Sequence, residues 1–128
     1  MIILDTSVWI EYFRGNPPFY KHVSDLLVRN EVCAVSPIFG ELLQGAGNTG
    51  ERAVISEIWN NLPKAPEDEL FIRAGTESGR NKWPDKGVGL IDGVILMAAR
   101  ENVSFIWTLD RKLMRLLKPE EKYHPKQA

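Results

Sequence analysis

Residues 1–6, MIILDT, constrain the fold more than any other stretch of the chain. Four apolar residues run without polar alternation into the carboxylate of Asp5. A short unbroken apolar run is typical of a strand buried on both faces, as in parallel sheets flanked by helices. In open sheets of this kind, ligands bind beyond the carboxyl ends of the strands. We therefore expect Asp5 to mark the functional edge of the molecule, with other carboxylates converging on it.

The rest of the chain predicts an alternation of helices and strands. Helical spacing of apolar residues is found in residues 7–14, 19–30, 38–44, 54–62, 67–80, 90–101 and 111–118, and buried strands are predicted at 32–35 and 104–109. Alternation of strand and helix favours a mostly parallel sheet with helices on both faces. The sequence therefore predicts one α/β domain over residues 1–128, a three-layer α/β/α sandwich.

Composition narrows the class of protein. The chain has 128 residues, 44% of them hydrophobic and 26% charged, as in an ordinary water-soluble domain. No apolar run reaches the roughly 18 residues that span a bilayer, and no signal peptide is recognisable, so we expect no membrane association. The one cysteine, Cys33, falls in a predicted buried strand, which fits a reducing cytoplasm.

Charge is distributed unevenly along the chain. The net charge is −1, but residues 1–63 carry −3 and residues 64–128 carry +2. The second half can therefore present local basic surface to a polyanion. Residues 79–89 form the longest predicted loop, with three glycines and Trp83. We favour a plain connector there over a mobile flap that touches nucleic acid by charge and stacking.

Four acidic residues stand out by their positions: Asp5, Glu41, Asp92 and Asp110. The three aspartates precede or open predicted helices, where each taken singly is explained as a cap that stabilises by about 1 kcal/mol. Glu41 lies inside its helix, beside the apolar face, and has no capping role there. Strands that end at Asp5 and Asp110 terminate at the same edge of a parallel sheet. The four residues together predict a carboxylate cluster.

Such a cluster needs a neutralising partner. Two carboxylates about 4 Å apart repel by about 4 kcal/mol at an effective dielectric constant near 20. Either protons or a cation must offset this repulsion. Carboxylate oxygens without His or Cys ligands suit Mg²⁺ or Mn²⁺, and neither His22 nor His124 has a spacing that suggests zinc. The cluster therefore predicts a divalent metal.

The same segments resemble a known family. Residues 3–15, ILDTSVWIEYFRG, look like the opening of PIN-domain proteins, especially the VapC-type toxins of prokaryotic toxin–antitoxin pairs. Glu41 within 36–42, Asp92 within 90–99 and Asp110 within 108–113 match the second, third and fourth acids of the family. The resemblance spans the chain in order. Gly93 stands where alanine is usual, and Leu113 where an aromatic residue is common.

The resemblance implies a metal-dependent endoribonuclease with a PIN-like fold. Asp5, Asp92 and Asp110 would hold one or two Mg²⁺ or Mn²⁺ ions, with Glu41 completing the cage or reaching the metal through water. The metal would activate water and stabilise charge on the attacked phosphate. The basic residues Arg111, Lys112 and Lys82 are candidates for binding RNA phosphates. A homodimer and inhibition by a cognate antitoxin protein are implied in the same way.

Two other classes of function stay open from the residues alone. A phosphoryl-transfer enzyme of the haloacid-dehalogenase kind also places Asp after its first strand, but it normally has a second Asp where Ser7 stands. A response-regulator receiver is a similar rival. The chain is alternatively a non-catalytic interaction module whose acids only cap helices. A covalent aspartyl-phosphate on Asp5 would favour the first two, and absence of Mn²⁺ binding the third.

Overall fold

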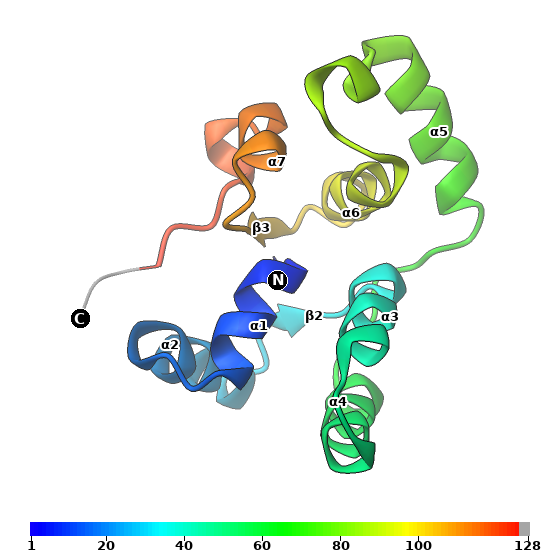
Figure 1. The fold of residues 1–128 in the computed structure, drawn as a ribbon. Helices are drawn as coiled ribbons and strands as arrows, with labels where there is room; N and C mark the ends of the chain where they lie inside the picture. The colour runs from blue at the N-terminus through cyan, green and yellow to red at the C-terminus, as the bar shows by residue number, and fades with distance from the viewer. Residues whose placement is uncertain (126–128) are drawn as a thin grey trace.

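A computed structural model describes residues 1–125 and has a three-stranded parallel sheet at its centre (Figure 1). β1 (Ile2–Leu4) lies between β2 (Val32–Cys33) and β3 (Phe105–Trp107). Ile3 is in register with Cys33 on one side and with Ile106 on the other. All three residues of β1 are buried, because a central strand of a covered sheet has neither an open edge nor an open face. The predicted parallel α/β architecture is confirmed.

Seven α-helices surround the sheet in the described part of the chain. They are α1 (Thr6–Phe13), α2 (Pro17–Val28), α3 (Ser36–Gly45), α4 (Thr49–Asn61), α5 (Leu70–Asn81), α6 (Leu90–Glu101) and α7 (Arg111–Leu116). Two short 3₁₀ helices, η1 (Trp83–Lys86) and η2 (Pro119–Glu121), complete the elements. In Figure 1, α1 and α2 lie together on one side of the sheet, and α5 packs against α6 on the other.

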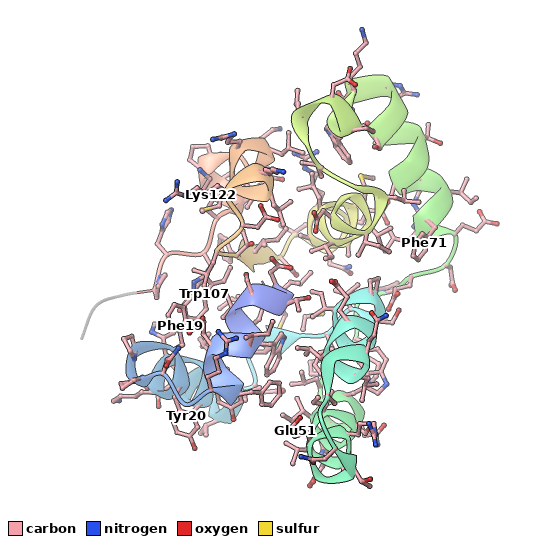
Figure 2. The ribbon with its side chains drawn as sticks, in the orientation of Figure 1. Phe19, Tyr20, Glu51, Phe71, Trp107 and Lys122 are labelled. Atoms are coloured by element: carbon pink, nitrogen blue, oxygen red, sulfur yellow. The ribbon has the colours of Figure 1, made fainter. Side chains whose placement is uncertain are left out.

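Aromatic packing fixes α2 against β3. The rings of Phe19 and Trp107 stack with centroids 5.7 Å apart, and Figure 2 shows both between α2 and β3. The segment after η2 adds to the open edge of β3, where the amide of Tyr123 donates to the carbonyl of Ile106 at 2.8 Å. The hydroxyl of Tyr123 also hydrogen-bonds to His22 on α2 at 2.5 Å. The C-terminal segment therefore ties β3 to α2, although its sequence pattern predicts nothing.

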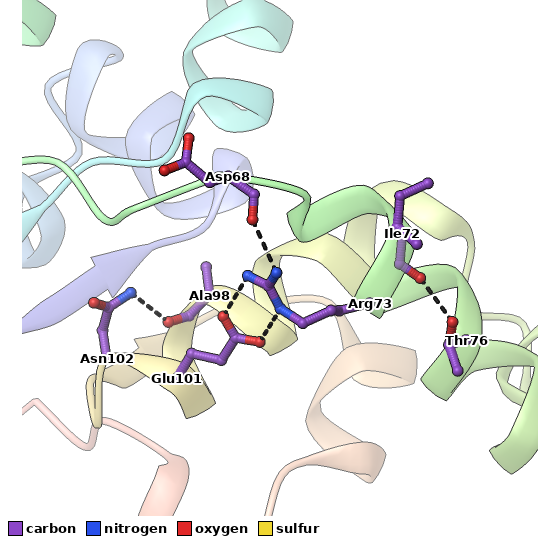
Figure 3. Close-up of polar contacts among 7 residues, drawn as sticks. All are labelled: Asp68, Ile72, Arg73, Thr76, Ala98, Glu101 and Asn102. Atoms are coloured by element: carbon purple, nitrogen blue, oxygen red, sulfur yellow. Dashed lines mark hydrogen bonds and ion pairs between the residues drawn. The ribbon is translucent and has the colours of Figure 1, made fainter.

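An ion pair joins α5 to the C-terminal end of α6. Nε and Nη2 of Arg73 donate to the two carboxylate oxygens of Glu101 at 2.7 and 2.8 Å, and Nη1 donates to the carbonyl of Asp68 (Figure 3). A fork-shaped guanidinium suits this bidentate geometry. The pair fastens the outer helix α5 to the helix that packs on the sheet.

Several predicted boundaries differ from the structure, most clearly the start of α4 and the loop 79–89. α4 begins at Thr49 rather than at residue 54, because Oδ1 of Asn48 accepts from the amide of Glu51 and caps the helix there. In the predicted loop 79–89, α5 continues to Asn81 and η1 follows at once. Trp83 is only 4% exposed, so it cannot stack on a nucleic-acid strand in this conformation. The segment therefore forms the end of α5 and a short 3₁₀ turn with a buried tryptophan.

Cys33 is buried and unpaired, as expected for a core thiol. Within residues 1–125, no helix combines the length and the apolar character that crossing a membrane requires.

Candidate active site

The candidate site forms where β1 and β3 end side by side. Asp5 directly follows β1, and its amide donates to the carbonyl of Trp107 at 2.9 Å. The next residue after β3 is Thr108, whose hydroxyl donates to Oδ2 of Asp5 at 2.7 Å. Asp5 and Thr108 are each 6% exposed. The parallel register thus brings a buried carboxylate and a buried hydroxyl together from opposite ends of the chain.

Two hydroxyls connect Asp5 to the segment that carries Asp110. The Thr108 hydroxyl also accepts from the amide of Asp110 at 3.0 Å. The Ser7 hydroxyl donates to Oδ2 of Asp5 at 3.3 Å and accepts from the amide of Leu109 at 3.1 Å. Asp5 and Asp110 are therefore held in fixed relation by groups that both carry a donor and an acceptor.

Asp110 does act as a cap, whereas Asp5 does not. Oδ1 of Asp110 accepts from the amides of Lys112 and Leu113, at 2.8 and 3.4 Å, at the start of α7. Asp5 occupies the N-cap position of α1 but makes no side-chain cap bond there. Its carboxylate accepts from Thr108 and Ser7 instead. The capping explanation therefore accounts for Asp110 in part and fails for Asp5.

Glu41 reaches the same edge from α3. Its Oε1 accepts from the hydroxyl of Thr6 at 3.2 Å, and Thr6 is the residue next to Asp5. Glu41 is exposed, unlike Asp5. The second acid thus stands at the rim of the site, where solvent or a ligand can approach it.

Asp92 lies half-buried in the first turn of α6. Burial, together with the negative charges of Asp5, Asp110 and Glu41, raises the pKa of Asp92 from its ordinary 3.8 to about 6. Burial disfavours the charged form of a carboxyl group, and nearby carboxylates disfavour it further. The structure therefore brings all four predicted acids within electrostatic reach of one another.

Positive charge from the chain does not offset this cluster. Five ion pairs occur within residues 1–125, and none involves Asp5, Glu41, Asp92 or Asp110. The oxygen-only donor set suits a hard divalent cation. As the side chains stand, however, no three His, Cys, Asp or Glu residues of the described chain form a ready metal cage. The donors fit Mg²⁺ or Mn²⁺ in chemistry, and binding would require the side chains to close on the ion.

The predicted RNA-binding residues are exposed and make no ion pair within residues 1–125. Arg111 and Lys112 directly follow Asp110 at the start of α7. Lys82 lies farther along the chain, between α5 and η1, in a left-handed backbone conformation with φ 55°. Arg111 and Lys112 are therefore next to an acid of the cluster in the sequence, whereas Lys82 directly precedes η1.

Sequence reasoning undervalued the hydroxyls of the site. The pattern of acids singles out neither Ser7 nor Thr108. Both flank an acid in the sequence, in Asp5-Thr6-Ser7 and Thr108-Leu109-Asp110. Hydroxyl residues one or two positions from a strand-ending carboxylate were the available signal.

An apolar groove opens beside the acids. It has a volume of about 600 Å³ and is lined from α1, α3 and α4, with Thr6 and Glu41 at the end nearest the cluster. Its apolar lining consists of Ile10, Phe13, Leu42, Ala46, Val54 and Ile55. Glu51, labelled in Figure 2, lies on its α4 side, and Arg14 lines it from the chain just after α1. Ile10, Phe13 and Val54 are among the exposed large apolar residues of the chain.

Both the sequence and the fold are similar to those of known proteins. The sequence matches the family model described as PIN domain over residues 2–118. It is similar to Ribonuclease VapC32 of Mycobacterium tuberculosis, with 30% identity over 117 residues, covering 88% of this chain and 87% of the relative. Ribonuclease VapC11 of the same organism is 30% identical over 74 residues, which is 56% of this chain and 55% of the relative.

Two solved structures share the fold. One is the crystal structure of VapBC2 from Rickettsia felis bound to a DNA fragment from its promoter, with TM-score 0.68, 19% identity and coverage of 95% of this chain and 96% of the other. The other is FitAcB from Neisseria gonorrhoeae, with TM-score 0.60, 18% identity and coverage of 90% and 91%.

Proposed function

The chain belongs to the PIN-domain family, and on that premise we propose that it is a divalent-metal-dependent endoribonuclease that acts as the toxin of a toxin–antitoxin pair. One observation carries the proposal: four carboxylates from four separate segments meet at one sheet edge, and no cation of the described chain is paired with them. The relatives named as VapC ribonucleases support the same activity.

Asp5, Asp92 and Asp110 would hold Mg²⁺ or Mn²⁺, with Glu41 as a fourth ligand from the rim. A divalent cation supplies charge neutralisation at the attacked phosphate and makes water more acidic. Burial, together with the negative charges of the neighbouring carboxylates, raises the pKa of Asp92 to about 6, and such a cation would relieve the repulsion among these carboxylates. We propose these four residues as the catalytic and metal-binding set.

The surrounding hydroxyls would keep the acids in place. Thr108 fixes one oxygen of Asp5 by donating to it and fixes the backbone of Asp110 by accepting from its amide. Ser7 donates to that same oxygen of Asp5. No side-chain hydrogen bond within residues 1–125 reaches the other oxygen of Asp5, which we propose binds the metal. Hydrogen bonds of this kind orient metal ligands and increase their affinity.

RNA would approach along the cations that follow the acids. Arg111 and Lys112 stand at the start of α7, and Lys82 and Lys86 flank η1. None of them makes an ion pair within residues 1–125, so their charge is free for phosphates. Cations beside an acidic site let a nearly neutral protein hold a polyanion.

The apolar groove between α1, α3 and α4 is the surface we propose for the antitoxin. Its walls expose Ile10, Phe13 and Val54, and it ends at Glu41. A bound segment with apolar side chains and one terminal cation would fill the groove and approach the acids. The similarity of the fold to proteins solved as VapBC2 and FitAcB supports a partner of this class.

A second apolar patch suits the predicted homodimer. Phe71 and Ile72 on α5 and Leu90 and Ile91 on α6 are 40–72% exposed. Leu90 lies 4.0 Å from the position of a Cβ on Gly75, so the two helices contribute to one surface. Figure 2 labels Phe71 on α5. We propose that a second copy covers this patch.

Residues 1–128 would form one PIN-like domain that works in the cytoplasm. The family match over residues 2–118 supports the first point, and the single buried thiol of Cys33 supports the second.

The decisive experiment is cleavage of a total-RNA pool by purified protein, with Mn²⁺ or Mg²⁺ and, separately, with a chelator. We expect metal-dependent cleavage that disappears in Asp5→Asn purified in the same way. Equal cleavage by both proteins would mean a contaminating ribonuclease or a wrong assignment of Asp5. A protein that neither cleaves RNA nor binds Mn²⁺ would refute the proposed function.

A further inference from the structure

The turn formed by residues 83–87 lies against the starts of α6 and α7, where Asp92 and Asp110 stand. Trp83, its first residue, is 4% exposed. Carbons Cε3 and Cζ3 of its ring lie 3.4 Å from where a Cβ on Gly93 would stand. Gly93 directly follows Asp92 in α6. Glycine inside a helix destabilises it relative to alanine, so its presence here makes room for the edge of the indole ring.

The other end of the turn contacts α7. Gly87 has φ +79°, and a Cβ there would lie 2.9 Å from Cδ of Lys112. The aliphatic part of Lys112 therefore lies directly on the backbone of Gly87. The amide of Lys112 donates to Oδ1 of Asp110 at 2.8 Å. The 83–87 turn thus bridges the helix starts that carry Asp92 and Asp110.

Buried groups and internal hydrogen bonds hold the turn. The amide of Val88 donates to the carbonyl of Trp83 at 3.1 Å, and the amide of Gly87 donates to the carbonyl of Pro84 at 3.0 Å. Val88 is fully buried. The guanidinium of Arg100 lies 6.0 Å from the centre of the Trp83 ring. The turn is therefore held in place at both ends, so it can in turn hold the helix starts that it contacts.

We propose that Trp83 is a positioning residue of the active site: its ring, seated on Gly93, holds the first turn of α6 so that Asp92 stands beside Asp5 and Asp110. The proposal rests on the proposed function, because the ligand that these acids share is the divalent cation. Since the carboxylates do not form a ready cage, the backbones that carry them must be held close enough for the side chains to close on the ion.

Titration calorimetry of the full chain with Mn²⁺, without RNA, tests this role. We expect Trp83→Ala to weaken Mn²⁺ binding about 10- to 100-fold, the range found for groups that orient metal ligands. Leu26→Ala is the matched control, because Leu26 is 1% exposed and lies on α2, which carries none of the four acids. It should lower the melting temperature and leave Mn²⁺ affinity unchanged. In Trp83→Ala, excess Mn²⁺ should restore kcat for RNA cleavage.

A double-mutant cycle separates positioning from simple packing. A Cβ on Gly93 would meet the ring edge at 3.4 Å, the near limit of ordinary contact, so Gly93→Ala alone should leave Mn²⁺ binding close to that of the wild type. Trp83→Phe removes part of the ring edge that touches Gly93 and should weaken binding. The double variant should recover affinity, because the new methyl group fills the space that the smaller ring leaves.

The outcomes distinguish the two proposals. A wild-type protein that binds no Mn²⁺ would refute the proposed function. A wild-type protein that binds Mn²⁺, together with a Trp83→Phe variant of unchanged affinity, would overturn the role of Trp83 alone. If Trp83→Ala does not fold, the milder Trp83→Phe variant still decides. Strictly additive losses in the cycle would also contradict it.

Discussion

The two ends of α6 differ in how their carboxylates are neutralised: the one at the C-terminal end is paired with a cation, and the one at the N-terminal end is not. At the C-terminal end, Glu101 accepts two hydrogen bonds from Arg73 (Figure 3), and this partner holds the pKa of Glu101 below its ordinary value. Next to it, Arg100 donates to Glu121 at 2.8 Å. At the N-terminal end, the Asp92 side chain makes no hydrogen bond or ion pair within residues 1–125, and its pKa rises to about 6.

The helix dipole alone predicts the reverse pattern. It favours a carboxylate at the N-terminus of a helix and disfavours one at the C-terminus, by about 0.3–1 kcal/mol. Neighbouring groups override it at both ends: a guanidinium lowers the pKa of Glu101, and burial with three carboxylates raises that of Asp92. The fold neutralises charge where only stability is involved and leaves like charges together at the sheet edge. Strain retained in this way is typical of functional sites.

The largest expected effect is on metal binding. Asp92→Asn removes a proposed ligand and should weaken Mn²⁺ binding by about 100-fold or more, beyond the loss for groups that only orient ligands. Glu101→Gln is the control at the other end of α6 and should leave affinity unchanged. Titration calorimetry with both variants decides, and equal affinities would mean that the two ends do not differ in function.

The pH dependence of Mn²⁺ binding should reflect protonation of the Asp92 carboxyl group. Because its pKa is about 6, Mn²⁺ must displace a proton below that pH and none above it. Affinity should therefore fall about 10-fold for each pH unit below 6 and level off above 6. Calorimetry between pH 5 and 7.5, in two buffers of different ionisation enthalpy, measures both the affinity and the proton released. A flat profile would contradict the raised pKa.

Neutralising the carboxylate at either end of α6 should change the stability of the metal-free protein, with opposite sign at the two ends. The folded state raises the pKa of Asp92, so ionisation of Asp92 destabilises the fold; the penalty is absent below about pH 4 and complete above about pH 6. Asp92→Asn should remove it and stabilise the metal-free protein at pH 7 by about 1 to 2 kcal/mol, allowing for partial exposure.

Glu101→Gln should instead destabilise the metal-free protein by at most about 1 kcal/mol, since its pair with Arg73 is partly exposed. Thermal melts in chelator give both values. A lower melting temperature for Asp92→Asn would show that the cluster stabilises the fold.

The smallest effect should come from a single phosphate contact. Lys112→Met keeps the hydrocarbon chain that lies on Gly87 and removes the charge. We expect KM for RNA to rise a few-fold and the salt dependence of binding to lose about one unit of slope, with kcat unchanged. Lys21→Met, at a cation already paired with Asp25, should change neither quantity.

The sheet and the acids were predictable because each depends on a local pattern. The apolar run before Asp5 predicts a buried strand, and parallel strands end at one edge, so Asp5 and Asp110 are brought together by topology alone. The start of α4 was mispredicted, since apolar periodicity begins only at residue 54 whereas the cap at Asn48 sets the first turn.

Interactions across long sequence distances were not predictable. Nothing local indicates that Thr108 pairs with Asp5, 103 residues away. Nor does the composition of the 79–89 loop indicate that Trp83 is buried on Gly93. The sequence favours a plain connector there, and the structure adds a contact that the sequence does not indicate: the indole ring of Trp83 packs on α6 at Gly93.

The position of β1 between β2 and β3 has a consequence for synthesis of the protein. β1 receives its second neighbour only after Phe105–Trp107 has been made. The hydrogen bond from the Thr108 hydroxyl to Asp5 likewise forms only after Thr108 has been made. Pairing over so long a sequence separation is slow to form. A nascent chain that has not yet reached Thr108 and Asp110 therefore lacks two residues of the proposed site, and the proposed nuclease activity is expected only after both have been made.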